Sequence, residues 1–424
     1  MKKDKYEELL EMHNKDVEEI SSIYDFEIEK YRKEIENQKQ ELQSIYNSKA
    51  WKLITKYREI KTSFKRNNDV IFNNIIEKIN DYKTKEITNC NIEYNNNNPL
   101  ITYVIPGCTI SGGVGVVCQH VNRLKKRGYN VLLITEGKDT NIDWFPNQNV
   151  KIVTLDNAPK NIDILIATSW TTAYASKTLN ACKRMYFVQS DESRFYAKDS
   201  IEQKLVLDTY SMDFIFITEA KWIQKWLKEK FNKESHYVPN GIDTEYIYPT
   251  IDRYSNQNRR KRVLLEGPID IPYKGMEDAF NAIKDLDCEV WCVSTLGKPK
   301  KEWKCDKFFE NVPFTNMNYL YSNCDVLLKM SRIEGFFGPP MEMMACKGAC
   351  VVGKVSGYDE YIVDEENALV VEQGDINAAC YAVKKLLEDD KLRDKLSSNG
   401  YKTSKKWQWD RSIDLLEEII NSLI

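Results

Sequence analysis

Two glutamates near the C-terminal end stand at a spacing that suits the binding of a polyhydroxyl ligand. Seven residues separate Glu334 from Glu342, within the stretch SRIEGFFGPPMEMMA at 331–345. The preceding apolar run, 324–330, predicts a buried parallel strand, which places Glu334 in the loop after it. The prolines at 339 and 340 suit the first turn of a following helix, so Glu342 is expected in that turn. A helix start attracts phosphate, and a carboxylate there can hold the diol of a ribose or another sugar.

A simpler explanation is that Glu342 only complements the helix dipole, an effect worth about 0.3–1 kcal/mol. That explanation accounts neither for Glu334 nor for the sequence Gly-Phe-Phe-Gly at 335–338, whose backbone can approach a ligand closely. The interpretation with two functional carboxylates is therefore favoured.

A glycine-containing loop occurs in the N-terminal half as well. Residues 100–105 predict a strand, 107–115 a loop containing Ser-Gly-Gly-Val-Gly, 116–127 a helix and 130–135 another strand. Such a βαβ unit offers bare backbone N–H groups to a phosphate or a sugar. The loop lacks the G-x-G-x-x-G spacing of dinucleotide sites. His120, about one turn into the helix, is more often a core histidine than a catalyst.

Two further segments, 163–170 and 183–192, each predict a strand that ends in polar residues. Open α/β sheets bind ligands at these carboxyl edges. The second segment ends in Gln-Ser-Asp-Glu, so Asp191 or Glu192 could orient a substrate hydroxyl or accept its proton. Carboxylates in a loop are, however, usually just solvated.

Taken together, these motifs resemble the retaining nucleotide-sugar glycosyltransferases of the GT-B fold, specifically the large family 4. The family signature usually runs EGFG-x-PP-x-E-A-M-A-x-G, and this chain has EGFFGPPMEMMACKG. The chain keeps both glutamates and the double proline, and it places Phe337 and Gly338 where the family has Gly and then an apolar residue. The segment YVPNGID at 237–243 matches the family's P-N-G-(I/V)-D at the domain junction. The resemblance covers roughly residues 100 to 420 in the expected order.

This resemblance implies that Glu342 binds the nucleotide ribose and that Glu334 lies at the donor sugar near its reacting face. The family usually carries Gly-Arg at the end of the strand expected here at 262–267, and Lys-Gly some residues later. Both cations neutralise the diphosphate leaving group. Lys274 is present, but Gly-Pro stands in place of Gly-Arg. Lys274 therefore carries this charge alone or shares it with Arg332 or a helix N-terminus.

The predicted site divides into two sets. The predicted catalytic residues are Glu334, Lys274, Asp191 and Glu192. The predicted donor-binding residues are Gly112, Gly113, Lys274, Arg332, Gly335, Phe336, Phe337, Gly338 and Glu342. Many family members place a His after the second polar-ended strand, where this chain has Gln-Ser-Asp-Glu at 189–192.

Composition narrows the function classes. A chain of 424 residues suits two or three domains, and its net charge of −3 argues against general nucleic-acid binding. The eleven cysteines lack the spacing of a common zinc site, and with only three histidines we expect no metal centre. Reduced thiols in a cytoplasmic protein are the simpler account. We expect neither a signal peptide nor a membrane span, since no apolar run reaches about 18 residues.

The first 66 residues follow a different pattern. Apolar residues recur at sevens over 1–48 without Pro or Gly, which predicts a long helix and a coiled coil that would form a homo-oligomer. A hairpin within one chain and a helix on a partner stay open. Residues 49–66 hold seven Lys and Arg against one Glu. This basic amphipathic helix either lies on an anionic membrane or packs on its own enzyme.

The predicted fold class is α/β: a GT-B architecture of two Rossmann-like domains that face a cleft, preceded by the helical extension. The expected boundaries are 1–66 for the extension and 67–99 for a linker. The N-terminal, acceptor-side domain is expected at 100–245, completed by a C-terminal helix at 409–424. The nucleotide-sugar-binding domain is expected at 246–408.

The function implied by the resemblance is that of a metal-independent hexosyltransferase that needs no cofactor. It would move a sugar from a nucleotide-diphosphate donor to a glycan, lipid-linked or protein acceptor, with retention, in bacterial surface polysaccharide or glycoprotein synthesis. It would act in the cytoplasm or at the inner face of the cell membrane. Two alternatives stay open: a GT-B nucleotide-sugar epimerase, and a non-catalytic scaffold that acts through its coiled coil.

Overall fold

The computed structural model describes residues 98–250 and 259–424, all within one compact unit. The predicted coiled coil at 1–48, the basic helix at 49–66 and all but the last two residues of the linker lie outside the described residues. Two parallel sheets with helices on their faces make up the fold, which confirms the prediction of two Rossmann-like domains. Among the described residues, no helix combines the length and the apolar character that a membrane span requires.

The N-terminal domain contains a seven-stranded sheet in the order β3-β2-β1-β4-β5-β6-β7, and every neighbouring pair is parallel. Its central strands are nearly continuous apolar runs because both faces of the sheet are covered. The strands are β1 (Leu100–Ile105), β2 (Asn130–Thr135), β3 (Ile152–Thr154), β4 (Ile162–Ala167), β5 (Ala181–Val188), β6 (Ile215–Thr218) and β7 (Ser235–Tyr237). The helices are α3 (Gly112–Lys126), α4 (Trp170–Ala175), α5 (Ile201–Thr209) and α6 (Lys221–Phe231).

The C-terminal domain contains a six-stranded parallel sheet in the order β10-β9-β8-β11-β12-β13. Successive residues of β8 face opposite sides: Val263 and Leu265 join one core cluster with α7 and α10, and Leu264 joins another with α8 and α9. The strands are β8 (Arg262–Glu266), β9 (Glu289–Ser294), β10 (Lys307–Glu310), β11 (Val326–Lys329), β12 (Ala349–Gly353) and β13 (Leu369–Val371). The helices are α7 (Met276–Ile283), α8 (Phe314–Asn323), α9 (Gly338–Ala345), α10 (Ile376–Glu388) and α11 (Asp390–Ser404).

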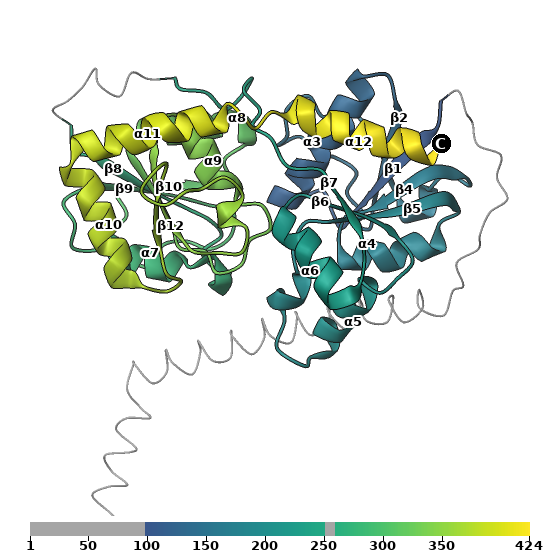
Figure 1. The fold of residues 1–424 in the computed structure, drawn as a ribbon, viewed down its shortest axis with the longest axis horizontal. Coiled ribbons are helices and arrows are strands. Elements are labelled where there is room, and N and C mark those ends of the chain that lie inside the picture. Colours follow the sequence, from purple (N-terminus) through teal and green to yellow (C-terminus); the bar gives the residue numbers. More distant parts are fainter. Residues whose placement is uncertain (1–97, 251–258) are drawn as a thin grey trace, which may run out of the picture. The chain divides into compact units, whose positions relative to one another are not determined.

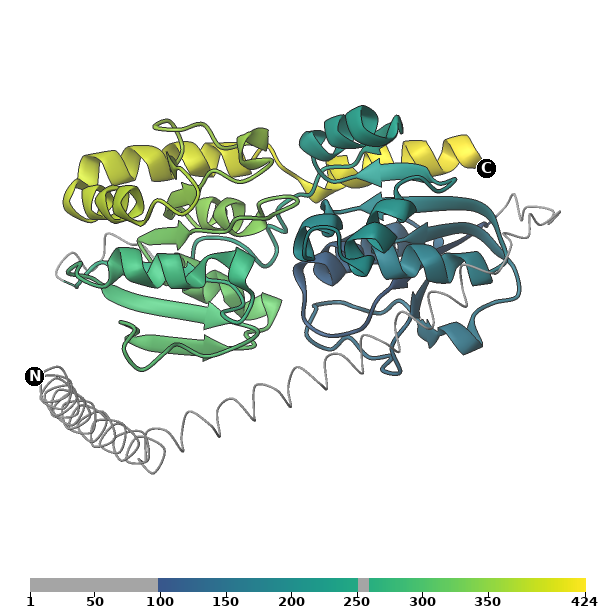
Figure 2. The same cartoon turned by 90° about the horizontal axis from the view of Figure 1, so that it is seen from below.

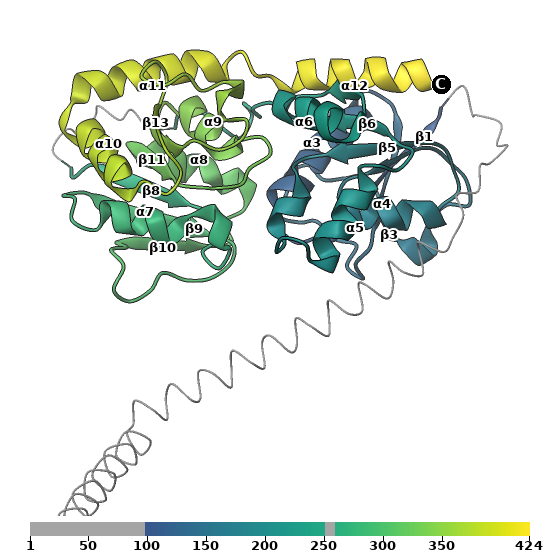
Figure 3. The same cartoon turned by 60° about the horizontal axis from the view of Figure 1, so that its bottom comes forward.

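After α11 the chain returns to the N-terminal domain as α12 (Trp409–Leu423), which the views in Figure 1, Figure 2 and Figure 3 show in yellow. Ile413, Leu416 and Ile420 of this helix are buried in the same core cluster as β1 and α3. The returning chain passes against the Pro-Asn-Gly-Ile-Asp segment. A Cβ atom on Gly241 would come within 2.3 Å of the backbone nitrogen of Trp409, so only glycine fits there.

In both sheets the strand order reverses between two neighbouring strands: β1 and β4 in the first, β8 and β11 in the second. Ligands of open α/β sheets bind outside the carboxyl ends of such strands. The glycine-rich segment at 111–115 follows β1, and the first glutamate of the pair, Glu334, lies in the loop after β11. The topology thus points to the same edges as the motifs.

The glycine-rich segment differs from its prediction. Helix α3 begins at Gly112, four residues earlier than expected, so Gly112 and Gly113 lie in its first turn and not in a loop. The cause is Ser111, whose side chain accepts a hydrogen bond from the backbone N–H of Val114 at 3.2 Å. This N-cap stabilises an early helix start in spite of the glycines.

Candidate functional site

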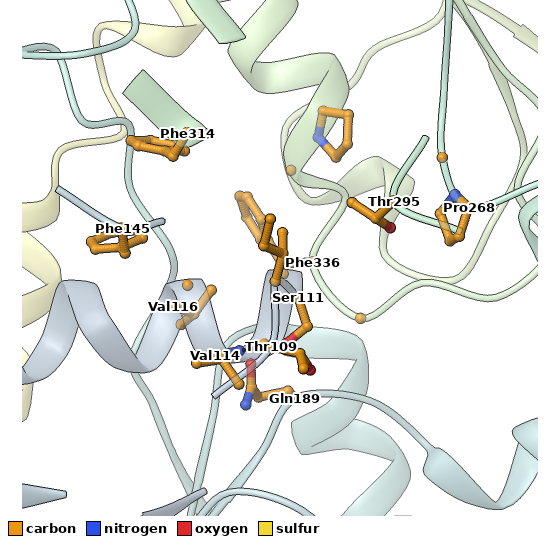
Figure 4. Close-up of a pocket in the computed structure, with 18 of the residues that line it drawn as sticks. Thr109, Ser111, Val114, Val116, Phe145, Gln189, Pro268, Thr295, Phe314 and Phe336 are labelled. Carbon is orange, nitrogen blue, oxygen red and sulfur yellow. Dashed lines mark hydrogen bonds between the residues drawn. The ribbon is translucent and has the colours of Figure 1, made fainter. Parts of the chain in front are cut away.

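One pocket is lined by both domains and collects most of the predicted site residues. Figure 4 shows Ser111, Val114 and Gln189 from the N-terminal domain, and Pro268 and Thr295 from the C-terminal domain, with Phe336 near the middle. The predicted residues that line the pocket are Gly112, Gly113, Glu192, Lys274, Glu334, Gly335, Phe336, Gly338 and Glu342. Asp191, Arg332 and Phe337 are not part of this lining.

Lys274 and Glu334 form an ion pair in the pocket, with 2.8 Å between Nζ and Oε2. The loop of Lys274 is held against the end of β11 by Gly275, which has φ +64° and whose added Cβ would lie 1.9 Å from the carbonyl oxygen of Met330. Burial alone would raise the pKa of Glu334, but the charges of Lys274 and Lys329 lower it overall. Glu334 is therefore a largely buried carboxylate that stays ionised.

Glu342 lies in α9, but not in the first turn as predicted. The helix begins at Gly338, before both prolines, so Glu342 is its fifth residue. Tyr321 of α8 donates a hydrogen bond to Oε2 of Glu342 at 2.8 Å. Burial raises the pKa of Glu342 to about 7, although this hydrogen bond opposes the rise. The carboxyl group thus titrates in the physiological range, with one oxygen fixed by the phenol.

Gly335 allows the two domains to touch beside the pocket. A Cβ atom on Gly335 would lie 1.7 Å from the carbonyl oxygen of Gln189 and 2.7 Å from Oε1 of Glu219. Across the same contact, the indole N–H of Trp222 donates to the carbonyl oxygen of Gly335 at 2.8 Å. The glycine is thus needed for the approach of another part of the protein backbone.

Glu219 is a pocket residue that the sequence analysis did not select. It follows β6, is buried, and accepts hydrogen bonds from the backbone N–H of Phe336 and from Nδ2 of Asn240, both at 2.8 Å. Burial raises the pKa of Glu219 to about 8 against these hydrogen bonds, and the charge of Glu334 adds to the rise. The sequence did contain a signal for Glu219, because this residue follows the end of a predicted strand. The same rule had pointed to Glu192.

Of the two candidate acceptor-side carboxylates, Glu192 lines the pocket and Asp191 does not. Glu192 Oε2 accepts from the backbone N–H of Trp170 at 2.8 Å and from the hydroxyl of Tyr186 at 3.0 Å. Burial raises the pKa of Glu192 to about 7 against these two hydrogen bonds. Asp191 instead caps a short turn of helix by accepting from both the N–H and the hydroxyl of Ser193.

The remaining predicted residues have other surroundings. Arg332 is half exposed and pairs with Asp278 at 2.6 Å. Phe337 is fully buried in the core of the C-terminal domain. His120 is buried and lies 3.3 Å from the hydroxyl of Tyr103, which confirms it as a core histidine, and burial lowers its pKa to about 3. Within the described residues, no group of three or more His, Cys, Asp and Glu is arranged to hold a metal ion.

Lys329, a second cation in the pocket lining, was also missed by the sequence analysis. It is the last residue of β11, its side chain is only 3% exposed, and it forms an ion pair with Glu266 at the end of β8. In sequence, Lys329 stands in an apolar run that is recognisable only as a buried strand.

Comparison with known proteins shows similarity to glycosyltransferases over part of the chain. The sequence model described as "Glycosyl transferases group 1" matches residues 306–403, which include both glutamates. An uncharacterized glycosyltransferase of Methanocaldococcus jannaschii is 25% identical over 218 residues, covering 49% of this chain and 59% of that protein. The N-acetylgalactosamine-N,N'-diacetylbacillosaminyl-diphospho-undecaprenol 4-alpha-N-acetylgalactosaminyltransferase of Campylobacter jejuni is 36% identical over 99 residues, covering 23% and 26%. The chain therefore spans 59% or less of the length of these two relatives.

The fold has solved counterparts. The structure of the Anabaena protein HepE in complex with UDP-glucose aligns with a TM-score of 0.63 and 14% identity, covering 77% of this chain and 100% of that one. At this level of identity the likeness concerns the fold. It agrees with the two facing parallel-sheet domains described above.

Proposed function

We propose that this chain is a group 1 glycosyltransferase of the GT-B fold, which transfers a sugar from a nucleoside diphosphate donor to an acceptor hydroxyl, with retention. The match of residues 306–403 to the group 1 model, the glycosyltransferase relatives and the GT-B-like fold support this proposal. The observation that carries the proposal is the convergence of Glu342, Glu334 and Lys274 on one pocket that also contains the start of α3. These groups match the parts of such a donor: a diol, a sugar and a diphosphate.

Glu342 is suited to the ribose. Tyr321 occupies one of its oxygens, and the carboxylate retains acceptor sites for two hydroxyl groups of a diol. Hydrogen bonds to a charged acceptor are about twice as strong as neutral ones, which favours the ionised form of Glu342 when a ribose is bound.

Lys274 and Glu334 are suited to the reacting end of the donor. The bond between the anomeric carbon and the diphosphate oxygen breaks, and a new bond to the acceptor oxygen forms on the same face of the sugar. The acceptor proton passes to the leaving diphosphate, whose growing charge Lys274 stabilises. Glu334 Oε1 is buried and accepts no hydrogen bond from the described residues, so it is available to a sugar hydroxyl.

On the opposite wall, Glu192 is the carboxyl group placed to orient an acceptor hydroxyl. Its pKa of about 7 means that it can accept a hydrogen bond when ionised and donate one when protonated. The acceptor is a glycan, a lipid-linked saccharide or a protein, in surface-glycan synthesis. The name of the Campylobacter relative includes an undecaprenol-linked substrate, which supports the lipid-linked class. Membrane attachment through residues 49–66 would place the enzyme beside such an acceptor, and liposome sedimentation of the full chain tests it.

The test is a panel of nucleotide sugars incubated with the full-length protein, with mass spectrometry of the products. We expect one donor to be hydrolysed slowly without acceptor, with EDTA having no effect, and proton NMR to show that the released sugar first appears with the donor's anomeric configuration. Release of an isomerised sugar would indicate an epimerase. Binding of no nucleotide sugar at all would overturn the proposal.

A further inference from the structure

The end of strand β8 carries no cation, because Gly267 and Pro268 stand there. Gly267 has φ +145°, and a Cβ atom built on it would lie 3.4 Å from Nζ of Lys329 and 3.7 Å from Cβ of Lys274. The ammonium group of Lys329 thus fills the space next to the end of β8 from the neighbouring strand. Pro268, seen in Figure 4, and both lysines belong to the pocket lining.

Lys329 reaches this position because of the strand register. The pairing of Leu328 in β11 with Leu265 in β8 brings Lys329 beside Glu266, at the point where the strand order reverses. Lys329 donates a hydrogen bond to the backbone oxygen of Glu266 at 2.9 Å and forms an ion pair with its carboxylate. An ammonium group has three N–H donors. Its two bonds to Glu266 leave the third for a ligand in the pocket.

Packing does not require a lysine at this position. The other three residues of β11 are Val, Leu and Leu, all buried, and a further apolar side chain would continue the strand. Lysine is almost never fully buried without a partner, and removing its charge from water costs several kcal/mol. A buried lysine that faces a ligand pocket therefore calls for a reason beyond stability.

Charge balance in the pocket supplies such a reason. The wall from the C-terminal domain carries three carboxylates, Glu266, Glu334 and Glu342, and two ammonium groups. A diphosphate brings further negative charge, and Lys274 is already paired with Glu334. One lysine would be a weak counterion for such a ligand, whereas two lysines, one from the loop after β8 and one from the end of β11, can hold it between them.

We propose that Lys329 is the second cation for the donor diphosphate, taking the place of a basic side chain at the end of β8. The inference rests on the proposed function and assigns the missing charge to β11. Glu266 keeps the ammonium group ionised and oriented, and the remaining N–H donates to a phosphate oxygen as that oxygen leaves the sugar.

Calorimetry with the full-length protein tests the assignment. The probes are UDP, GDP and ADP, with uridine, guanosine and adenosine as matching ligands that lack phosphate. We expect Lys329→Met to weaken binding of the preferred diphosphate by about 10- to 100-fold, the loss of one charged hydrogen bond. Binding of the nucleoside should be unchanged, and Lys329→Arg should restore part of the diphosphate affinity. Lys354→Met, which removes an exposed lysine paired with Glu372 in the same domain, is the matched control.

A double variant distinguishes phosphate binding by Lys329 from a role in which Lys329 only neutralises the charge of Glu266. Glu266→Gln with Lys329→Met leaves no unpaired buried charge, so it should fold even if the single variant does not. If Lys329 binds phosphate, the double variant stays weak for the diphosphate. Recovery of wild-type affinity in the double variant would overturn the inference.

Two further outcomes have separate meanings. If wild type binds a diphosphate, and Lys274→Met loses it but Lys329→Met does not, the inference about Lys329 falls and the proposed function stands. If wild type binds none of the three diphosphates, the proposed function falls and this inference falls with it.

Discussion

Lys274 and Glu334 form an ion pair of 2.8 Å that joins the loop after β8 to the loop after β11. In the free protein each residue holds the other in position, and their side chains are 22% and 10% exposed. A diphosphate can approach Lys274 only by sharing it with Glu334, while sugar hydroxyls offer Glu334 new donors. We therefore expect donor binding to exchange this pair for contacts on both sides of the bond that breaks.

Replacing Lys274 should affect chemistry more than folding. Lys274→Met removes a preorganised donor to the leaving group, which typically costs about 10²–10³ in rate. The pKa of Glu334 should rise, because its nearest cation is gone. Initial rates of donor hydrolysis and thermal melting of the same samples measure the two effects. The control is Lys298→Met, at an exposed lysine that pairs with Glu310. A normal rate in Lys274→Met would mean that another group stabilises the charge of the leaving diphosphate.

Glu342 should make nucleotide affinity depend on pH. Glu342→Gln removes a charged acceptor for the ribose, so affinity should fall by about 10- to 100-fold above pH 8. In wild type, Glu342 becomes protonated as the pH falls through about 7, so the advantage over the variant should shrink below that value. Titrations of both proteins with one nucleoside diphosphate between pH 5.5 and 8.5 give this difference. Ionisation of the phosphate affects both proteins alike and cancels in the comparison. If the difference in affinity between wild type and variant stayed constant with pH, Glu342 would not be the residue that binds the ribose.

Because of Glu219, the folded protein should become less stable against unfolding as the pH rises. Its folded-state pKa is raised from 4.5 to about 8, so between these values the folded protein holds a proton that the unfolded chain has lost. Stability is then greatest at the acid end of this window and declines through it. Glu219→Gln stays neutral, and its melting temperature relative to wild type should increase from pH 5 to pH 8. Glu229→Gln, at an exposed position of α6, should show no such trend.

The sequence was sufficient for elements whose signals are local. The strands β1 and β2 begin and end at the expected residues, and the helix α12 begins at the expected residue and ends one residue early, since each is an apolar pattern between polar ends. The start of α3 was missed because one capping side chain, Ser111, outweighs the helix-breaking tendency of two glycines. Both glutamates of the signature, selected by their spacing, line the pocket.

Contacts between distant parts of the chain limit what can be predicted from the sequence. Lys329 is held by a hydrogen bond to Glu266, which lies 63 residues earlier in the chain. Glu219 is held by a hydrogen bond from Phe336, which lies 117 residues later. Each looks unremarkable among its own neighbours: a lysine in an apolar run and a carboxylate at a strand end. Only the strand register and the contact between the domains bring their partners within hydrogen-bond distance.

Gly335 should be sensitive to a single added methyl group. In Gly335→Ala the new Cβ would lie 1.7 Å from the carbonyl oxygen of Gln189, a backbone atom that cannot rotate away. The loop must move, which breaks the hydrogen bond from Trp222 and displaces Glu334 next to it. A displacement of about 1 Å at a reacting centre can cost about 10²-fold in rate. Donor hydrolysis should fall accordingly, and small-angle X-ray scattering should show whether the domains separate.

A second glycine variant distinguishes this clash from a general cost of losing glycine. Gly107 lies in the loop after β1 without a positive φ, and a Cβ atom on it would have nothing within 4 Å. Gly107→Ala should therefore retain wild-type melting temperature and donor hydrolysis. Since the two variants add the same atom, only the space around it differs. Equal activity in Gly335→Ala and Gly107→Ala would mean that the loop of Glu334 does not need its contact with Gln189 for catalysis.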